Sequence, residues 1–188
     1  KYIQNSKPEI FHKTFYNDFW PKNFKGRKFL TVYDLIYEKF YKEYNFPSDY
    51  RPKKKALDNS DGIFAISNNT KKDLMEFYDV PEKKIFVTHL AANLMTENVN
   101  NKIIGDPFIL FVGDRKRYKN FKNLLKAYAL SEKIKQSFKL VVFGWDDFYN
   151  DEKKLLREYE LNDDKIIKVS GDDSLLASFY KKAKLFIF

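Results

Sequence analysis

The sequence predicts an α/β fold made of two units, each with a parallel sheet. Two observations lead to this prediction. Short, continuously apolar runs recur along the chain, and such runs are typical of strands that are buried on both faces of a parallel sheet. Segments with apolar residues at i, i+3, i+4 and i+7 lie between them, and this is the period of a helix with one buried face.

The alternation is most regular in the second half of the chain. The expected order is strand, helix, strand, helix, strand, helix, strand, which is typical of a Rossmann-like unit. The expected strands are 108–112, 138–143, 166–169 and 185–188, and the expected helices are 120–130, 151–160 and 174–182.

The first half follows the same plan less regularly. Its expected strands are 9–12, 29–33, 62–66 and 85–87, and one helix with a basic face is expected at 49–59. A second helix is expected to begin at a capping box formed by residues 70–73. The stretch before residue 107 is polar, Asn-rich and without period. We therefore expect one domain at 1–92, an interdomain linker at 93–106 and a second domain at 107–188.

The composition narrows the function classes. A hydrophobic fraction of 44% and an aromatic fraction of 18% indicate a folded core, and the formal charge of +9 favours an anionic partner. That partner could be nucleic acid, a membrane surface or a phosphorylated small molecule. The chain has no Cys and two His, so neither a disulfide framework nor a metal site is expected. No apolar run is long enough to span a bilayer, and the cytoplasm is the default location.

The segment LFVGDRKRYKNF, at 110–121, carries the strongest chemical signal. Gly113 ends an expected strand, where the missing Cβ lets a ligand approach the backbone closely. Arg115 can grip a phosphate with two parallel N–H groups, and Lys119 supplies a compact positive charge. The free N–H groups of the following helix also favour an anion. The combination suits a diphosphate, and a solvated basic loop is an equally weighted alternative.

Several common motifs are absent. No strict Asp-x-Asp metal–nucleotide motif occurs, and the six glycines are isolated, which excludes the G-x-G-x-x-G and P-loop patterns. The commonest dehydrogenase and NTPase interpretations are therefore removed. G-x-S-x-G is missing as well, which removes the commonest hydrolase interpretation.

Six segments in the same order resemble the GT-B glycosyltransferases of family 4. LFVGDRKRYKNFKNLLKAYA is similar to the family's VGxRxxYKN…LLxAF segment, and SDGIFAISNNTKKDLMEFYDVPEKKIFVTHLAAN is similar to ADxIIAVSxxTKxDLxxxxxVPxxKIxVxxxGV. The other four are KPEIFH, FLTVYDLIYEKF, KLVVFG and VSGDDSLLASFYKKAKLFIF. The resemblance implies two Rossmann-like units, both incomplete, because family members begin earlier and continue past Phe188 into a glutamate-bearing donor loop. It also implies that this internal fragment alone is inactive.

The resemblance implies roles for particular residues. Arg115 and Lys119 match the positive pair that stabilises the leaving diphosphate of the donor, in place of a divalent metal. Gly113 allows close backbone approach, and the backbone near Gly171 and Asp172 would meet the nucleobase. No cofactor is implied besides the nucleoside-diphosphate sugar, which is the donor substrate.

Asp34 is kept as an acceptor-side catalytic candidate, with a cap of the following segment as the alternative. Tyr33 departs from the family pattern, because many members carry His there. A structural role is favoured for His12, a turn or cap for Ser67, and solvated faces for the paired lysines at 53–55, 71–72, 83–84, 153–154 and 181–182.

The resulting prediction is a metal-independent, retaining glycosyltransferase in cell-surface polysaccharide synthesis. It would move a sugar from a nucleoside-diphosphate sugar, with GDP-mannose weakly favoured, to a glycan or lipid-linked acceptor. The expected location is the cytoplasm or the inner face of the membrane, where the basic faces would favour peripheral association. No nucleic-acid partner is expected. The alternatives are a basic nucleic-acid-binding protein and a non-catalytic protein of the same fold.

Overall fold

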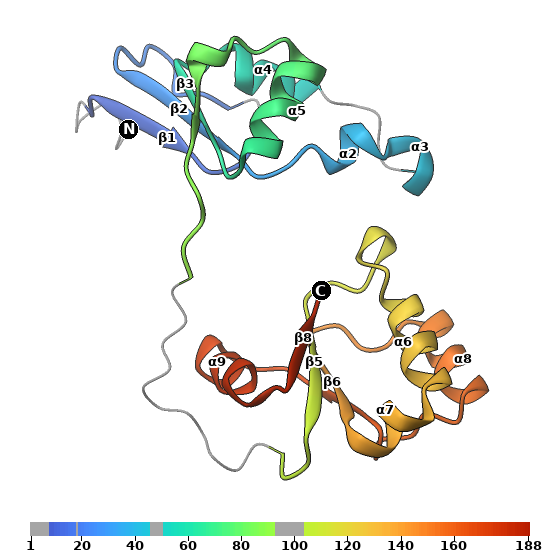
Figure 1. Cartoon of the computed structure of the whole chain (residues 1–188). Coiled ribbons are helices and arrows are strands. Elements are labelled where there is room, and N and C mark those ends of the chain that lie inside the picture. The colour runs from blue at the N-terminus through green and yellow to red at the C-terminus, as the bar shows by residue number, and fades with distance from the viewer. Residues whose placement is uncertain (1–7, 18, 46–50, 93–103) are drawn as a thin grey trace. The chain divides into compact units, whose positions relative to one another are not determined.

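The computed structural model describes residues 8–17, 19–45, 51–92 and 104–188 of the 188-residue chain. The chain divides into two compact units, Lys1–Ala91 (unit 1) and Ala92–Phe188 (unit 2), and each has its own parallel sheet (Figure 1). Most of the linker expected at 93–106 lies outside the described residues.

Unit 1 contains a four-stranded parallel sheet in the order β1-β2-β3-β4. The strands are β1 (Ile10–Lys13), β2 (Arg27–Val32), β3 (Gly62–Ala65) and β4 (Ile85–Val87). The helices are α2 (Ile36–Lys39), α3 (Tyr41–Tyr44), α4 (Arg51–Asp58) and α5 (Asn68–Tyr78), and a 3-10 turn η1 (Glu82–Lys84) precedes β4.

The two faces of this sheet differ. On one face α4 and α5 pack against the strands, and their Leu57 and Leu74 join Leu30 and Ile63 in a fully buried core (Figure 1). The other face carries a row of aromatic rings. Phe29 and Phe64 stack with centroids 5.3 Å apart.

Two sequence expectations for unit 1 are wrong. The helix expected to begin at a capping box at 70–73 begins three residues earlier, because Ser67 is the N-cap and its Oγ accepts from the Thr70 N–H at 3.1 Å. This agrees with the cap role favoured for Ser67. Lys53, expected on a solvated face, is 6% exposed, because its ammonium group pairs with the buried Glu38 at 2.7 Å.

Unit 2 contains a second parallel sheet, in the order β7-β6-β5-β8. The strands are β5 (Phe108–Val112), β6 (Lys139–Phe143), β7 (Ile166–Val169) and β8 (Leu185–Ile187). The helices are α6 (Phe121–Leu130), α7 (Glu132–Ser137), α8 (Asn150–Glu158) and α9 (Asp173–Lys182), and a 3-10 turn η2 (Arg117–Lys119) precedes α6. The chain order therefore reverses between β5 and β8, and ligands of open parallel sheets bind at such a reversal, beyond the carboxyl ends of the strands.

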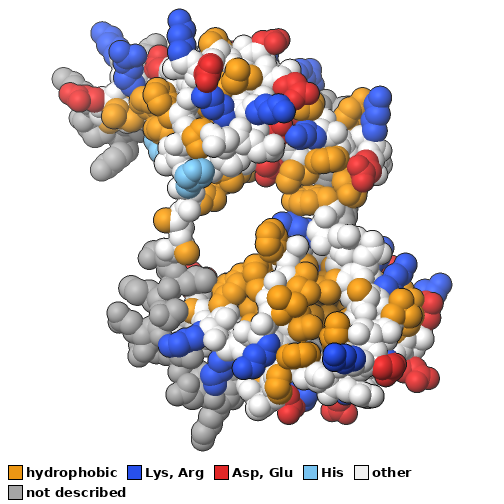
Figure 2. Space-filling model, in the orientation of Figure 1, with side chains coloured by type: hydrophobic (Ala, Val, Ile, Leu, Met, Phe, Trp, Pro, Cys, Tyr) orange, Lys and Arg blue, Asp and Glu red, His pale blue; other side chains and the backbone are white. Residues whose placement is uncertain are grey.

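Helices cover both faces of the second sheet (Figure 1). The side chains of alternate β5 residues pack on opposite faces of the sheet. Phe111 packs with Phe121 of α6 and the α8 side of the core, whereas Phe108 packs with Phe179 of α9. This arrangement explains why β5 is apolar at every position. Figure 2 shows hydrophobic side chains gathered over β8, where Leu185 and Phe188 are exposed.

Candidate functional site

The turns at the carboxyl ends of β5 and β6 lie side by side in unit 2. The N–H of Gly113 donates to the carbonyl of Phe143 at 3.1 Å, and a Cβ on Gly144 would lie 3.3 Å from the carbonyl oxygen of Gly113. Gly113 has φ +117, which a residue with a side chain adopts only with strain, and a Cβ added there would meet no atom within 4 Å. The backbone at Gly113 is therefore open to a ligand.

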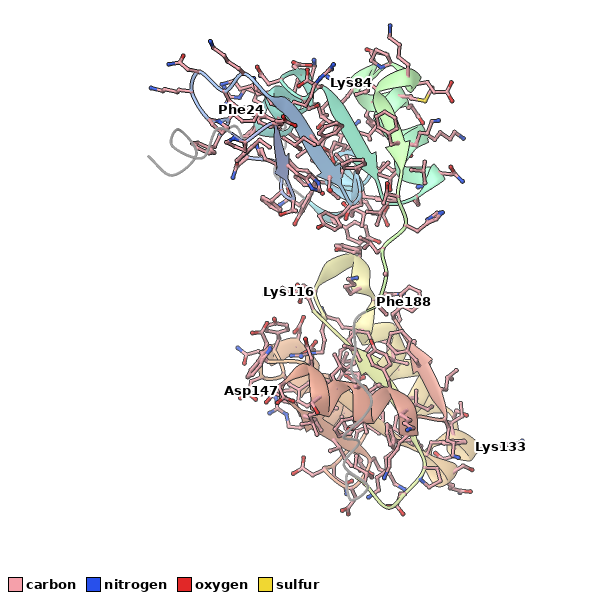
Figure 3. All side chains as sticks on the ribbon, turned by 90° about the vertical axis from the view of Figure 1, so that its left-hand side faces the viewer. Phe24, Lys84, Lys116, Lys133, Asp147 and Phe188 are labelled. Carbon is pink, nitrogen blue, oxygen red and sulfur yellow. The ribbon has the colours of Figure 1, made fainter. Side chains whose placement is uncertain are left out.

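Figure 3 shows which end of unit 2 this is. Lys116, from the loop between β5 and α6, and Phe188, just after β8, lie at the same end of the unit. Lys133 of α7 lies at the opposite end. The basic loop is thus at the carboxyl edge of the sheet, where the chain order reverses.

Arg115 lies inside the protein. Its side chain is 1% exposed, as is that of Glu152, and its Nε lies 3.2 Å from both carboxylate oxygens of Glu152. Its Nη2 donates to the carbonyl oxygens of Asp146 at 3.1 Å and Asp147 at 2.6 Å. These contacts join the β5–α6 loop to the β6–α8 loop and to the first turn of α8.

Three aromatic rings surround the same guanidinium group. Its Cζ lies 5.7 Å from the ring centroid of Phe121 and 5.2 Å from those of Phe148 and Tyr149. The fork predicted to grip a phosphate is therefore occupied by protein groups. The diphosphate role of Arg115 stays a prediction, and the contacts show a structural role that the sequence analysis missed.

The side chain of Lys116 is exposed, and its ammonium group has partners in the β6–α8 loop. Its Nζ lies 5.0 Å from the ring centroid of Tyr149 and 3.9 Å from Oδ2 of Asp146. The Tyr149 hydroxyl donates to Asp146 at 2.6 Å, and this bond raises the pKa of Tyr149 and lowers that of Asp146. A hydrogen bond with Tyr149 also raises the pKa of Lys116. Lys116 thus holds its charge while contacting the β6–α8 loop.

Lys119 lies in the 3-10 turn η2, just before α6. It is exposed, its Nζ lies 5.3 Å from the Tyr118 ring centroid, and within the described residues it takes part in no ion pair. Asn120 follows in the left-handed conformation at φ 57 and turns the chain into α6 without a side-chain cap. Lys119 thus lies two residues before α6, and no side chain caps the first N–H groups of this helix, which favour an anion.

The predicted nucleobase contacts, Gly171 and Asp172, lie between β7 and α9 at the same edge. Asp172 is exposed and is the N-cap of α9, because its Oδ1 accepts from the Leu175 N–H at 2.9 Å. Its carboxylate therefore serves the helix, which leaves the backbone of this turn for a base. The nucleobase role of both residues stays a prediction.

Replacement of this cap has a measurable cost. We expect Asp172→Ala to lower the free energy of unfolding of unit 2 by about 1 kcal/mol, because α9 loses the acceptor for one of its first N–H groups. Asp172→Ser supplies another acceptor, so its free energy of unfolding should stay close to that of the unchanged chain. Urea denaturation measures both, and equal losses in the two variants would contradict the capping role.

Asp34 and Tyr33 follow β2 in unit 1. Asp34 is half-buried, and its Oδ1 accepts from the Ile36 N–H at 3.1 Å. The N-cap of α2 is the next residue, Leu35, so Asp34 bonds to the start of this helix without being its N-cap. Lys53 donates to the Asp34 carbonyl at 3.4 Å. Burial, with a smaller contribution from the Asp34 carboxylate, raises the pKa of the neighbouring Tyr16 to about 12. The acceptor-side role of Asp34 stays a prediction.

The two histidines have structural contacts. Nε2 of His12 lies 2.8 Å from the Thr31 hydroxyl, and its ring meets Phe64 edge-on. Nδ1 of His89 lies 3.2 Å from the Ile66 carbonyl. In the described part of the chain, no group of three or more His, Asp or Glu side chains is arranged to hold a metal ion. The described helices include none with the length and apolar character needed to cross a membrane.

The family described as "Glycosyl transferases group 1" matches residues 95–188, which is half of the chain and covers the whole β5–β8 sheet. The chain belongs to the group 1 glycosyl transferases. A comparison with curated protein sequences gives no match. Finer membership in family 4 stays a prediction.

Solved structures resemble this group 1 chain in fold. The crystal structure of WaaG, a glycosyltransferase involved in lipopolysaccharide biosynthesis, superposes with a TM-score of 0.70 at 13% identity, covering 98% of this chain and 54% of WaaG. TarM, also determined from S. aureus in a complex with UDP, gives 0.64 at 14% identity, covering 87% of this chain and 32% of TarM. The pneumococcal O-GlcNAc transferase GtfA, in complex with UDP and GlcNAc, superposes with a TM-score of 0.61 at 14% identity. The match covers 86% of this chain and 32% of GtfA.

These likenesses confirm the predicted α/β fold of the GT-B type, with two parallel sheets. The chain spans about half the length of WaaG and about a third of TarM and GtfA. The sequence analysis missed Glu152, Tyr149 and Trp145 at the carboxyl edge. Trp145 carried a usable signal, because it follows a glycine at a strand end, as the residues after Gly113 do.

Proposed function

We propose that this group 1 chain takes part in transferring a sugar from a nucleoside-diphosphate sugar, and that the diphosphate binds on the β5–α6 loop of unit 2. One observation supports this most strongly. The open glycine turn at Gly113, the Lys119 cation and the start of α6 lie at the carboxyl edge of a parallel sheet, next to the point where its strand order reverses.

The proposed chemistry needs positive charge where the leaving diphosphate gains negative charge. Lys119 and the first N–H groups of α6 would supply it, in line with the metal-independent mechanism that the resemblance implies. Arg115 would hold the loop in place through Glu152, with direct contact to the diphosphate as the alternative. Asp34 remains the acceptor-side candidate.

The donor is proposed as a class. The TarM and GtfA complexes contain UDP, whereas GDP-mannose is favoured by the sequence resemblance alone. We therefore expect a nucleoside-diphosphate sugar and take UDP and GDP as the two probes. The retaining outcome and a role in cell-surface polysaccharide synthesis also rest on the resemblance, and anomeric analysis of the product tests the former.

A glycan or lipid-linked acceptor at the inner face of the membrane is part of the proposal. Three exposed aromatic residues lie on or between α2 and α3, close in sequence to Lys39 and Lys42. They are Tyr37, Phe40 and Tyr41. Rings beside lysines suit the interface of an anionic membrane. Co-sedimentation with anionic and neutral vesicles tests this part, and equal binding to both would contradict it.

The central test is a titration of the chain with UDP and GDP. We expect Lys119→Ala to weaken binding of the preferred nucleotide about tenfold to a hundredfold, because a charge-assisted contact with the diphosphate is lost. Lys126→Ala is the matched control, since it removes the same charge from an exposed position of α6. Equal affinity in the two variants would contradict the assignment of Lys119.

The nucleic-acid alternative predicts a different result. A +9 chain that binds phosphate backbones should bind a random oligonucleotide with an affinity that falls steeply with salt. Several lysines are instead paired within the protein, for example with Asp73, Glu82 and Asp106. Tight, salt-sensitive oligonucleotide binding without binding of UDP or GDP would overturn the proposed function.

A further inference from the structure

Trp145 is placed unusually for a tryptophan. It follows β6 directly after Gly144, and it is 79% exposed, although tryptophan is among the most buried residues on average. A large aromatic surface left in water contributes nothing to the core. An exposed ring of this kind at the ligand-binding edge of a sheet is suited to contact another flat, apolar surface.

The backbone around Trp145 is held on several sides. Its own carbonyl accepts from Lys168 of β7 at 3.5 Å, and Lys168 also lies 3.7 Å from Oδ1 of Asp147. The next two carbonyls, of Asp146 and Asp147, accept from Arg115. The loop is therefore fixed by the strand and loop on either side, while the ring at its tip stays exposed. Such a loop holds its ring ready at little entropic cost to binding.

The position of Trp145 relates it to the proposed diphosphate site. The residue before it, Gly144, lies against Gly113, since a Cβ there would be 3.3 Å from the Gly113 carbonyl oxygen. β6 is hydrogen-bonded between β5 and β7. Trp145 therefore emerges between the Gly113 turn and the Gly171 turn. Strands two apart are separated by about 10 Å, a distance that a ribose and a base can bridge from a diphosphate.

We propose that Trp145 stacks on the nucleobase of a nucleoside diphosphate whose diphosphate lies on the Lys119 loop. This inference rests on the proposed function and adds a subsite to it. Stacking reads the flat face of a base without regard to its hydrogen-bonding edge. Trp145 would then supply affinity for the nucleoside part, and the choice between uracil and guanine would fall to other groups near Gly171.

Tryptophan fluorescence gives a direct test, because the chain has two tryptophans, Trp20 in unit 1 and Trp145 in unit 2. Trp20→Phe leaves Trp145 as the reporter, and Trp145→Phe leaves Trp20. We expect UDP or GDP to quench the fluorescence of the Trp20→Phe chain and to leave that of the Trp145→Phe chain unchanged. Inorganic pyrophosphate, which lacks a base, should quench neither.

Calorimetric titration adds the energetic test. We expect Trp145→Ala to weaken binding of the nucleoside diphosphate about 5-fold to 100-fold, in line with the loss of one stacked base, and to leave pyrophosphate binding unchanged. Trp145→Phe should lose less affinity for the nucleoside diphosphate, because an aromatic ring remains. Leu130→Ala is the matched control, since it truncates a 75% exposed side chain at the end of α6.

The outcomes separate this inference from the proposed function. If Trp145→Ala binds UDP and GDP as the unchanged chain does, while Lys119→Ala binds them weakly, the stacking role is wrong and the diphosphate site stands. If Trp145→Ala weakens the binding of pyrophosphate and of the nucleotide equally, the residue supports the loop and does not contact the base. If the unchanged chain binds neither nucleotide, the proposed function fails and the inference fails with it.

Discussion

Arg115→Ala is expected to lower the free energy of unfolding of unit 2 by about 3–5 kcal/mol. The guanidinium group and the Glu152 carboxylate are each 1% exposed, so removal of one partner leaves the other charge buried and unpaired. The carbonyls of Asp146 and Asp147 lose their donor as well. Urea denaturation followed by hydrogen exchange, which resolves the two units, measures the loss.

Two comparisons sharpen this prediction. Lys122→Ala, which breaks the pair with Asp151 between α6 and α8, should cost at most about 1 kcal/mol, because that pair is more than half exposed. Arg115→Lys should recover little, since a lysine cannot reach Glu152 and both carbonyls with one ammonium group. A loss below 1 kcal/mol in Arg115→Ala would show that the Arg115–Glu152 pair is not maintained in solution.

The same variants distinguish the two roles of Arg115. If it only anchors the loop, Glu152→Ala and Arg115→Ala should weaken binding of UDP or GDP to a similar degree, because each releases the loop that carries Lys119. If its guanidinium group grips the diphosphate, Arg115→Ala should weaken binding far more than Glu152→Ala. The titrations need a temperature at which both variants remain folded, which circular dichroism establishes.

The strands show what the sequence could predict. The expected bounds of β4, β5 and β7 agree with the structure, because each strand begins and ends with an apolar residue that is flanked by a polar residue, proline or glycine. The short helices were missed for a physical reason. α2 and α3 have four residues each and α7 has six, too few to show a period of 3.6. A single residue, Ser131, separates α7 from α6, so the two helices appear as one segment in the sequence.

The contacts of the site could not be predicted from spacing. Arg115 and Glu152 are 37 positions apart, and their pairing depends on how β5 and β6 align in the sheet. The basic loop therefore appeared as a set of exposed cations, whereas the structure buries one, pairs another with Asp146 and leaves Lys119 available. Sequence indicated that the loop lies at the carboxyl edge of the sheet, and tertiary packing determined that Arg115 is buried there.

Lys53→Ala is expected to destabilise unit 1 by about 3–5 kcal/mol. The Lys53 ammonium group lies 2.7 Å from Oε1 of Glu38, and both side chains are almost fully buried, at 8% and 3% exposure. Tyr78 donates to the same oxygen at 2.6 Å, whereas Oε2 has no hydrogen-bond partner in the described part of the chain. Without Lys53, the Glu38 carboxylate would keep its burial and lose the charge that compensates it.

The adjacent residue on α4 provides the matched control. Lys54 pairs with Asp58 at 2.6 Å, but the two side chains are 51% and 55% exposed, so Lys54→Ala should cost at most about 1 kcal/mol. Both variants remove one lysine charge from the same helix. The difference in urea denaturation therefore isolates burial, and equal losses would contradict the pairing of Lys53 with Glu38.

A double variant tests whether the Lys53–Glu38 pair adds to the stability of unit 1, or whether removing one partner is costly only because the other charge stays buried. Replacing both partners, as Lys53→Met with Glu38→Leu, removes the buried charges together and should recover most of what Lys53→Ala loses, because apolar side chains of similar volume need no compensation. Lys53 also reaches the Asp34 carbonyl, so a stable double variant lacks one contact to the acceptor-side candidate. Recovery of most of the loss would show that the pair only has to be complete, whereas a loss as large as that of Lys53→Ala would show that the buried pair itself stabilises unit 1.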